Sequence, residues 1–243
     1  MTPATTAKFP GLAGMMVVRN EAGRYLRLAL EDLLSYCETV TVVDDASDDD
    51  TPAVLEELRS RHPELTVHRL SQPQFLRNES QLRQHLWAKT VAAGPRWIIC
   101  LDADELLEER WKTEGAGLLA RAGQLGAGLL CFNLYEFWGD KRHYRVDGFW
   151  NPHGRFVPTI IRYVPGHPYR WNSHPLHGGR FPENRPGPAL NVPLRVKHYG
   201  YANPADHRAK YERYITADPA GRYCPLSHYQ SILTPPVLRE WVE

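Results

Sequence analysis

The N-terminal part of the chain alternates between short apolar runs and longer segments with helical spacing. The apolar runs predict strands at residues 12–18, 39–43, 65–70 and 96–101. The segments between them predict helices at residues 26–37, 52–61 and 75–93. In the first of these, Leu26, Leu30, Leu33 and Leu34 share one face. Strands and helices in this alternation form right-handed βαβ units, so we predict an α/β fold with a parallel sheet of the nucleotide-binding kind.

The rest of the chain has a different composition. A segment rich in glycine, alanine and leucine at residues 115–128 is expected to hold a short helix near residues 118–120. Strands are predicted at residues 129–135 and 192–196, and a helix or helical turn at residues 204–214. Dense aromatic, proline, histidine and arginine residues between them favour strands and ordered loops suited to a ring-shaped acceptor or sugar. We therefore predict one domain with two halves, residues 1–114 and 115–243.

Composition narrows the class of protein. The 243 residues are 42% hydrophobic and 23% charged, and a net charge of +1 provides no global field to attract nucleic acid. No apolar run approaches the roughly 20 residues of a membrane-spanning helix, and the start of the chain does not resemble a signal peptide. The four cysteines form no CxxC pair and indicate free thiols. A cytoplasmic protein is expected, and peripheral contact with the inner membrane face stays open.

Carboxylates gather where two predicted strands end. Asp102 and Asp104 follow the apolar run at residues 96–101, so they are expected at the rim where open α/β sheets bind ligands. Carboxylates one residue apart can both reach one divalent cation. The alternative is a helix that begins near Glu105 with Asp104 as its cap. Asp44 and Asp45 are expected on the same rim, where a carboxylate can bind a base or ribose.

Other charged residues are candidates for binding anions or a metal. Asp48, Asp49 and Asp50 precede Thr51-Pro52 and are expected only to complement a helix dipole. The histidines between His143 and His198 fit no zinc spacing. His198 ends a strand-like run, however, and is a candidate to complete the metal coordination begun by Asp104. Each of three basic residues has a phosphate-binding and a solvated-surface interpretation: Arg83, Arg208 and Lys210.

Four short motifs follow one another along the chain, and their order is more specific than any one of them: RNE at 19–21, DDAS at 44–47, LDADE at 101–105 and HYG at 198–200. Together they resemble a family 2 glycosyltransferase of the GT-A fold, and in particular small bacterial-type enzymes with LDADE and a late HYG. The resemblance covers most of the chain. It implies a Rossmann-like, mostly parallel sheet, with a nucleotide-sugar-binding half at residues 1–114 and an acceptor-binding half at residues 115–243.

The resemblance also implies site residues. Asp45, with Asp44 beside it, matches the family's contact to the nucleotide base. Asp102 and Asp104 match the DxD motif, which meets the ribose and a Mg²⁺ or Mn²⁺ ion on the diphosphate, and His198 matches a histidine that joins the metal or diphosphate. Further matches are the segment bordering the uridine (Val17, Val18, Arg19 and Glu21) and the basic residue on the helix before the DxD strand (Arg83).

The chain departs from the family at the catalytic base. The branch often carries His-Glu after the fifth strand, whereas the comparable place here reads Leu176-His177-Gly178. Inverting transfer needs a base within reach of the acceptor hydroxyl. Asp147 is the first choice because it lies in an aromatic loop, although a turn role before glycine is the alternative. The other candidates are His174, His177 and Glu183.

The resemblance implies a metal-dependent inverting glycosyltransferase that uses a nucleoside-diphosphate sugar, UDP-linked by preference. Its acceptor is a glycan, a lipid-linked molecule or a small molecule, and a homodimer stays open. Two other classes remain. A sugar-1-phosphate nucleotidyltransferase should carry a glycine-rich loop where this chain reads Val18-Arg19-Asn20-Glu21-Ala22-Gly23. A non-catalytic carbohydrate- or nucleotide-binding protein on this scaffold is favoured by the missing base.

Overall fold

The computed structural model describes residues 8–174 and 179–243. Its N-terminal part contains β1 (Phe9–Val18), α1 (Leu26–Tyr36), β2 (Cys37–Asp44), α2 (Thr51–Arg61), β3 (Leu65–Arg69), α3 (Phe75–Val91), β4 (Trp97–Cys100) and β5 (Glu105–Leu107). Its C-terminal part contains α4 (Arg110–Gln124), β6 (Leu129–Trp138), β7 (His143–Arg145), η1 (Gly148–Trp150), β8 (Phe156–Arg162), β9 (Ala189–Tyr201), η2 (Pro204–Asp206), α5 (His207–Ala217), α6 (Leu226–Ser231) and β10 (Leu238–Glu240).

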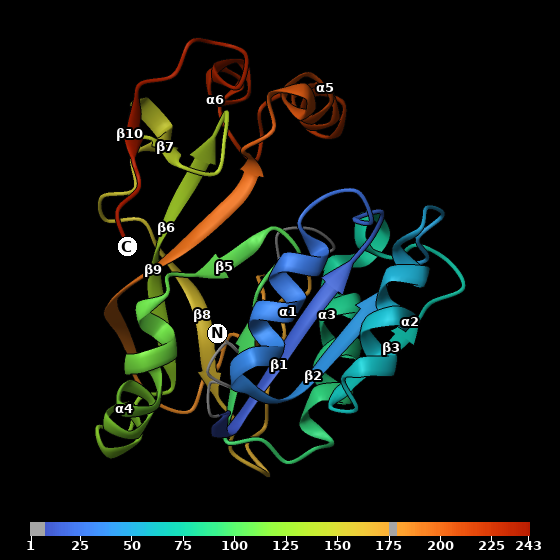
Figure 1. Cartoon of the computed structure of the whole chain (residues 1–243), viewed down its shortest axis with the longest axis vertical. Helices are drawn as coiled ribbons and strands as arrows, with labels where there is room; N and C mark the ends of the chain where they lie inside the picture. Colours follow the sequence, from blue (N-terminus) through green and yellow to red (C-terminus); the bar gives the residue numbers. More distant parts are fainter. Residues whose placement is uncertain (1–7, 175–178) are drawn as a thin grey trace, which may run out of the picture.

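The first strands form the predicted parallel sheet. β1 pairs in parallel with β2 and β4, and β3 adds to β2. Successive side chains of β1 point to opposite faces, so Met16 packs with α1 residues such as Leu30, whereas Met15 packs with α3 residues such as Leu86. The helices α1 and α3 accordingly cover opposite faces of the sheet (Figure 1). The α/β prediction for this part is confirmed.

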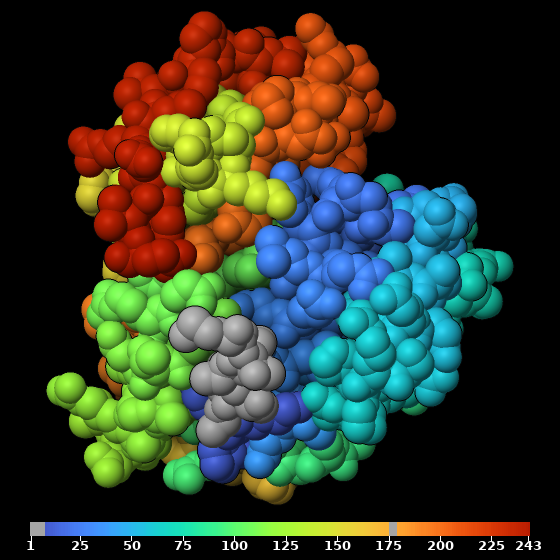
Figure 2. Space-filling view, in the orientation of Figure 1, coloured from blue at the N-terminus to red at the C-terminus, as the bar shows by residue number. Residues whose placement is uncertain are grey.

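The second half continues the same sheet in mixed directions. β8 pairs antiparallel with both β4 and β6, and β9 runs parallel to β6. The aromatic-rich segment therefore supplies strands, as expected, although β9 extends well beyond the predicted residues 192–196 and α4 is longer than the short helix expected near residues 118–120. Figure 2 shows the C-terminal residues, orange to red, as a lobe at one end of the molecule.

The helix proposed to begin near Glu105 does not form. Residues Glu105–Leu107 are the strand β5, which pairs antiparallel with β9 and sets Glu105 opposite His198. The backbone carbonyl of Asp104 accepts a hydrogen bond from the Tyr199 N–H at 2.8 Å. This alternative is ruled out because partners far along the chain satisfy the backbone groups that a helix would have used. Within the described residues, no helix combines the length and apolar character needed to cross a membrane.

Candidate active site

The loops that follow β1 and β2 are tied to each other. Asn20 and Ala46 both have a left-handed φ of 56°. The Asn20 side chain donates to Asp48 Oδ1 at 2.6 Å, and its Oδ1 accepts from the Asp48 N–H at 3.0 Å. Asp49 accepts from the Ala22 and Thr51 N–H groups. These two carboxylates therefore join the two loops, which is more than the helix-dipole role expected for them.

Asp44 and Asp45 are both buried at the end of β2. The oxygens of Asp45 accept hydrogen bonds from the backbone N–H groups of Gln74 at 2.6 Å and Phe75 at 2.9 Å, where α3 begins. Asp44 Oδ1 accepts from the Ser47 N–H at 2.9 Å, and its Oδ2 lies 3.4 Å from Arg69 Nε. Both carboxylates thus organise the rim, and the base contact expected of them stays a prediction.

Asp102 lies between two guanidinium groups. Arg83, on α3, is 3.4 Å from Asp102 Oδ1, and Arg180 is 3.0 Å from Oδ2. Burial alone would raise the pKa of Asp102, but Arg180 and Arg83 hold this pKa below its ordinary value. The side chain of Asp102 keeps 39% of its surface exposed. It is therefore an ionised carboxylate that is positioned by the protein and still open to a ligand.

Arg180 is a site residue that the sequence interpretation missed. Its guanidinium binds Glu105 through two hydrogen bonds, of 2.7 and 2.6 Å, and also donates to the Cys100 carbonyl at 3.3 Å. The Glu105 side chain is only 3% exposed. Arg180 comes from a loop of no regular period, so no pattern in the sequence indicated that it would reach the LDADE segment.

Asp104, His198 and Glu136 form a row of charged groups. His198 Nε2 lies 3.4 Å from Asp104 Oδ2, and His198 Nδ1 makes a short contact with Glu136 Oε2. Burial would lower the pKa of His198, but Glu136 and Asp104 raise it well above its ordinary value. Burial opposes ionisation of Glu136 as well, and His198 and Arg155 nevertheless lower its pKa to about 2. The row joins β5, β6 and β9.

The sequence analysis also failed to identify Glu136 as a site residue. It stands inside an apolar run that continues the predicted strand at residues 129–135, and its side chain is 3% exposed. Arg155 Nη1 lies 2.8 Å from its other oxygen. An acidic residue between two aromatic residues in a buried strand is itself a signal, since a buried charge requires a partner.

The remaining wall of this region comes from β9 and α5. Lys210 is buried, and its Nζ donates to the Gly200 carbonyl at 2.7 Å and lies 4.1 Å from the Tyr201 ring centroid. Glu21 lies nearby, and burial raises its pKa to about 7 against the lowering effect of Arg24. Lys210 is therefore a buried residue beside the site and not a solvated surface residue, and the phosphate contact expected of it stays a prediction.

The backbone at Gly200 lies close to the side chains of Lys210 and His198. A methyl group at this position would overlap Lys210 Nζ and come within 2.5 Å of His198 Nε2. Gly200→Ala should therefore displace the imidazole and weaken any divalent-ion binding at Asp104 and His198 by at least about tenfold. Titration of Mn²⁺ by calorimetry measures this effect.

Gly117→Ala is the matched control for Gly200→Ala. Gly117 lies in α4, and no atom is within 4 Å of the added Cβ, so this change should stabilise the fold by about 0.5–1 kcal/mol. Equal Mn²⁺ affinity in the two variants would contradict the role given to Gly200.

The other predicted residues lie in different surroundings. The carboxylate of Asp147 accepts from Arg145 Nε at 2.8 Å and from the Val237 N–H, so the structure assigns it a role in joining segments. His174, Glu183 and Arg208 are exposed, and Arg208 has no ion pair among the described residues. Val17 and Arg19 are half-buried at the rim. His177 lies outside the described residues.

The protein itself would supply two ligands to a divalent cation, Asp104 and His198. Among residues 8–174 and 179–243, no three His, Cys, Asp or Glu side chains converge as a metal-binding group. Asp104 and His198 nevertheless fit such an ion, because adjacent ligands of an octahedral ion lie about 3 Å apart. Glu136 contacts the other imidazole nitrogen, which is the usual arrangement that orients a metal-binding histidine. The remaining coordination positions would belong to a ligand such as a diphosphate.

Comparison with known proteins identifies the family of the chain that contains this site. A family model for glycosyl transferase family 2 matches residues 15–181. The chain belongs to glycosyl transferase family 2. The matched residues include the DDAS and LDADE segments and Glu136. His198 and Lys210, which complete the site of this family 2 chain, lie beyond the matched range.

Two uncharacterized proteins, from Mycobacterium bovis and Mycobacterium tuberculosis, resemble this family 2 chain in sequence. Each is 26% identical over 216 residues, which is 86% of this chain and 51% of theirs. The chain therefore spans about half the length of the curated relatives it matches.

Solved structures share the GT-A fold with this chain. TarS residues 1–349 of S. aureus has a TM-score of 0.55 at 14% identity, covering 91% of this chain and 69% of TarS. GalNAc-T7, with UDP, GalNAc and Mn²⁺, has 0.52 at 15%, covering 77% and 43%. The Pyrobaculum calidifontis mannosyltransferase PcManGT, with GDP-Man and Mn²⁺, has 0.51 at 14%, covering 92% and 70%.

Proposed function

We propose that this chain is a metal-dependent, inverting glycosyltransferase that uses a nucleoside-diphosphate sugar, UDP-linked by preference. The observation that carries the proposal is the approach of His198 to Asp104, at 3.4 Å, with Glu136 on the other imidazole nitrogen. GalNAc-T7 and PcManGT, which share the fold, are each solved with a nucleotide or nucleotide sugar and Mn²⁺. That occurrence supports a nucleotide-sugar donor and a divalent cation for this chain.

The donor would lie across the ends of β1, β2 and β4. We propose that Val17, Arg19 and Glu21 border the base, that Asp44 and Asp45 hold it, and that Asp102 binds the ribose. The ionised state and exposure of Asp102 support this role, since a free carboxylate oxygen accepts hydrogen bonds from hydroxyl groups. Each oxygen of Asp45 already accepts one hydrogen bond, from the Gln74 or the Phe75 N–H group. A contact with the base would therefore use the second lone pair of one of these oxygens.

Positive groups of the protein would favour departure of the diphosphate. A bound divalent cation would offset charge on the diphosphate oxygens. Arg83 and Lys210 add fixed positive charge from α3 and α5, and Arg208 is exposed at the same helix. Fixed charges in a partly buried site need no reorganisation as charge develops, which is why they stabilise a transition state.

The acceptor side is the half formed by residues 115–243, and the donor side is the half formed by residues 1–114. An acceptor hydroxyl would attack the anomeric carbon on the face opposite the diphosphate, so one displacement inverts the configuration. A base must take the hydroxyl proton. Asp147, His174 and His177 remain the proposed candidates, and the bonds from Arg145 and Val237 to Asp147 count against that residue.

The cysteines support a reducing compartment for this enzyme. Cys37, Cys100, Cys131 and Cys224 are all free thiols, and three of them are buried. Secreted proteins tend to carry disulfides, so we propose a cytoplasmic location.

The proposal is tested by binding and turnover on the full chain. Thermal unfolding with UDP should show a shift that requires Mn²⁺ or Mg²⁺, because a ligand that binds only the folded state stabilises it. A panel of UDP- and GDP-sugars, followed for metal-dependent hydrolysis, then identifies the donor. Absence of any metal-dependent nucleotide binding would overturn the proposal. Binding without turnover on every acceptor would instead indicate a non-catalytic carbohydrate- or nucleotide-binding protein.

Glu136 should tune the metal site through His198. Glu136→Gln keeps the shape of the side chain but removes the charge that orients and polarises the imidazole, so Mn²⁺ affinity should fall by about 10-fold. Calorimetric titration with Mn²⁺ in the presence of UDP measures the change. Glu56→Gln, on the exposed face of α2, is the matched control and should leave Mn²⁺ affinity unchanged. An unaltered affinity in Glu136→Gln would remove Glu136 from the site.

A further inference from the structure

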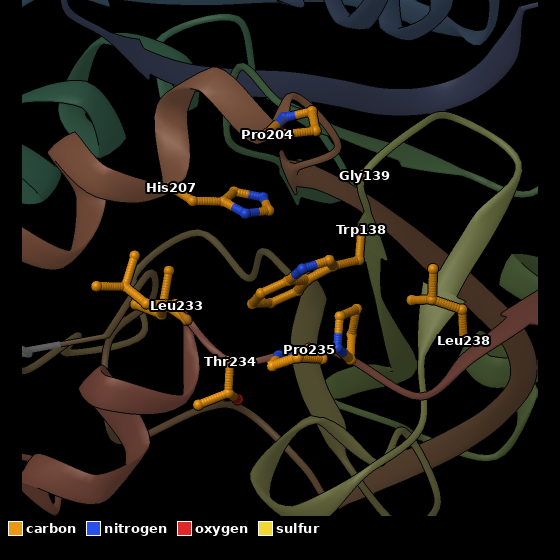
Figure 3. A pocket seen from close by; sticks show the side chains of 10 residues that line it. Trp138, Gly139, Pro204, His207, Leu233, Thr234, Pro235 and Leu238 are labelled. Atoms are coloured by element: carbon orange, nitrogen blue, oxygen red, sulfur yellow. The ribbon is translucent and has the colours of Figure 1, made fainter.

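A cavity of about 460 Å³, open to solvent, lies in the C-terminal lobe (Figure 3). Its walls include Trp138 at the end of β6, His207 at the start of α5, residues 232–236 and Leu238. The volume lies in the range of small-molecule pockets. Neither the family match at residues 15–181 nor the metal site accounts for this cavity.

Two buried aromatic side chains, Trp138 and Tyr201, stand between the cavity and His198 of the metal site. The Tyr201 ring stacks on Trp138, with a centroid distance of 4.6 Å and an interplanar angle of 9°. The same ring lies edge-on to His198 at 5.9 Å. A molecule in the cavity would therefore have to extend past these two rings for its end to reach the place where the donor sugar is proposed to lie.

The walls of the cavity suit a hydrocarbon better than a sugar or a phosphate. None of its ten described lining residues is Asp, Glu, Lys or Arg. Trp138 is 3% exposed, with Tyr201 stacked on it and the Arg145 guanidinium 4.5 Å from its ring centroid, so it has no open face for a sugar ring. Thr234 Oγ1 already bonds the Ser231 carbonyl and Arg145.

The outer rim is apolar as well. Leu233 and Leu238 line the cavity and are 39% and 40% exposed. The neighbouring Val237 is 59% exposed and does not line the cavity. Exposed apolar side chains that continue into a pocket are typical of a site for an apolar ligand.

His207 supplies one polar group inside this apolar wall. Its Nε2 lies 2.7 Å from the Tyr201 carbonyl, which only accepts hydrogen bonds, so Nε2 carries the proton. In the neutral imidazole, Nδ1 is then the hydrogen-bond acceptor. Figure 3 shows the ring between Pro204 and Leu233, directed toward the cavity.

The cavity is held in shape by hydrogen bonds of Arg145 and of Asp147, which sequence analysis had offered as a catalytic base. Arg145 donates to the Ser231 carbonyl at 2.7 Å and to Thr234, and Asp147 binds both Arg145 and the Val237 N–H. These bonds fasten the wall between Ser231 and Leu238 to β7. The pocket is therefore preformed.

We propose that this cavity is the acceptor subsite and that it takes the hydrocarbon part of an amphipathic acceptor, whose hydroxyl is positioned by His207. The assignment rests on the proposed glycosyltransferase function and narrows its acceptor to molecules that carry an apolar chain. The chain would lie against Leu233 and Leu238, and the polar end would face the metal site beyond Tyr201.

Alkyl β-glucosides from methyl to octyl, below their micelle concentrations, test the proposal by calorimetry on the full chain with UDP and Mn²⁺. Affinity should rise by about fourfold for each methylene that enters the cavity. Leu233→Asp and, separately, Leu238→Asp should each weaken octyl glucoside binding by about tenfold or more. Val237→Asp adds the same charge beside the cavity and should leave that binding unchanged.

The outcomes separate the subsite from the overall function. Affinity independent of chain length, or equal losses in Leu233→Asp, Leu238→Asp and Val237→Asp, would overturn the subsite. Loss of metal-dependent UDP binding in the unchanged protein would overturn the proposed function, while the chain-length series would still report on the cavity.

Discussion

Asp104→Ala should abolish metal-dependent UDP binding while the fold stays intact. Asp104 and His198 are the two protein groups that fit a divalent ion, and removing a ligand should cost more than the roughly 10- to 100-fold that loss of a supporting group costs in metal affinity. The burial of Asp104 opposes its ionisation, yet His198 and Lys210 lower its pKa below the ordinary value, so it is a carboxylate at neutral pH. Calorimetry with UDP and Mn²⁺ measures the loss.

The control for Asp104→Ala is Asp50→Ala, which removes a carboxylate outside the proposed metal site. Asp50 is exposed before α2 and makes no capping hydrogen bond with its side chain, so Asp50→Ala should bind UDP and Mn²⁺ as the unchanged protein does. The far-ultraviolet circular dichroism of both variants should match that of the unchanged chain. Retained metal-dependent binding in Asp104→Ala would refute the assignment of this residue.

Arg180→Met should destabilise the protein by about 3 kcal/mol. The change leaves the nearly buried Glu105 carboxylate without the guanidinium that binds it through two hydrogen bonds, and an uncompensated buried charge is costly. It also removes one of the two cations beside Asp102. Urea unfolding measures the loss of free energy, and UDP binding should weaken in parallel.

A second substitution separates charge from packing in this cluster. Glu105→Gln in the Arg180→Met background removes the stranded charge, so it should recover part of the lost stability. Arg27→Met, which breaks an exposed pair with Glu57, is the matched control and should cost much less stability, because solvent screens such pairs. A loss in Arg180→Met no larger than in this control would show that Arg180 does not hold the LDADE segment.

The parts of the fold that were predicted correctly have strong local patterns. Leu26, Leu30 and Leu33 repeat at helical spacing, and the strands of the parallel sheet are nearly continuous apolar runs. Asp104 and His198 were also brought together as expected from the order of the motifs. Local pattern therefore sufficed for the sheet, and the resemblance pointed to two side chains that lie together, while their role in holding an ion stays a prediction.

The rest depended on contacts between distant segments. Glu105 was given a helical alternative because its neighbours are good helix formers, but pairing of β5 with β9 overrides that local preference. Arg180 lies in a loop with no period, and its partners are more than seventy residues away in the chain. Asp147 seemed suited to catalysis from its aromatic surroundings, yet its bonds to Arg145 and Val237 exist only in the folded protein.

The antiparallel pairing of β5 with β9 limits where residues can be inserted or deleted in this chain. Because the ladder sets Glu105 opposite His198, the spacing between Asp104 and the imidazole is specified by the backbone and not by side-chain flexibility. An insertion or deletion of one residue in β9 before His198 would turn the histidine to the other face of the sheet, and one inside β5 would change which residues stand opposite it. Evolutionary variation in chain length should therefore be confined to the connecting loops, where the acceptor region can diversify without disturbing the ion.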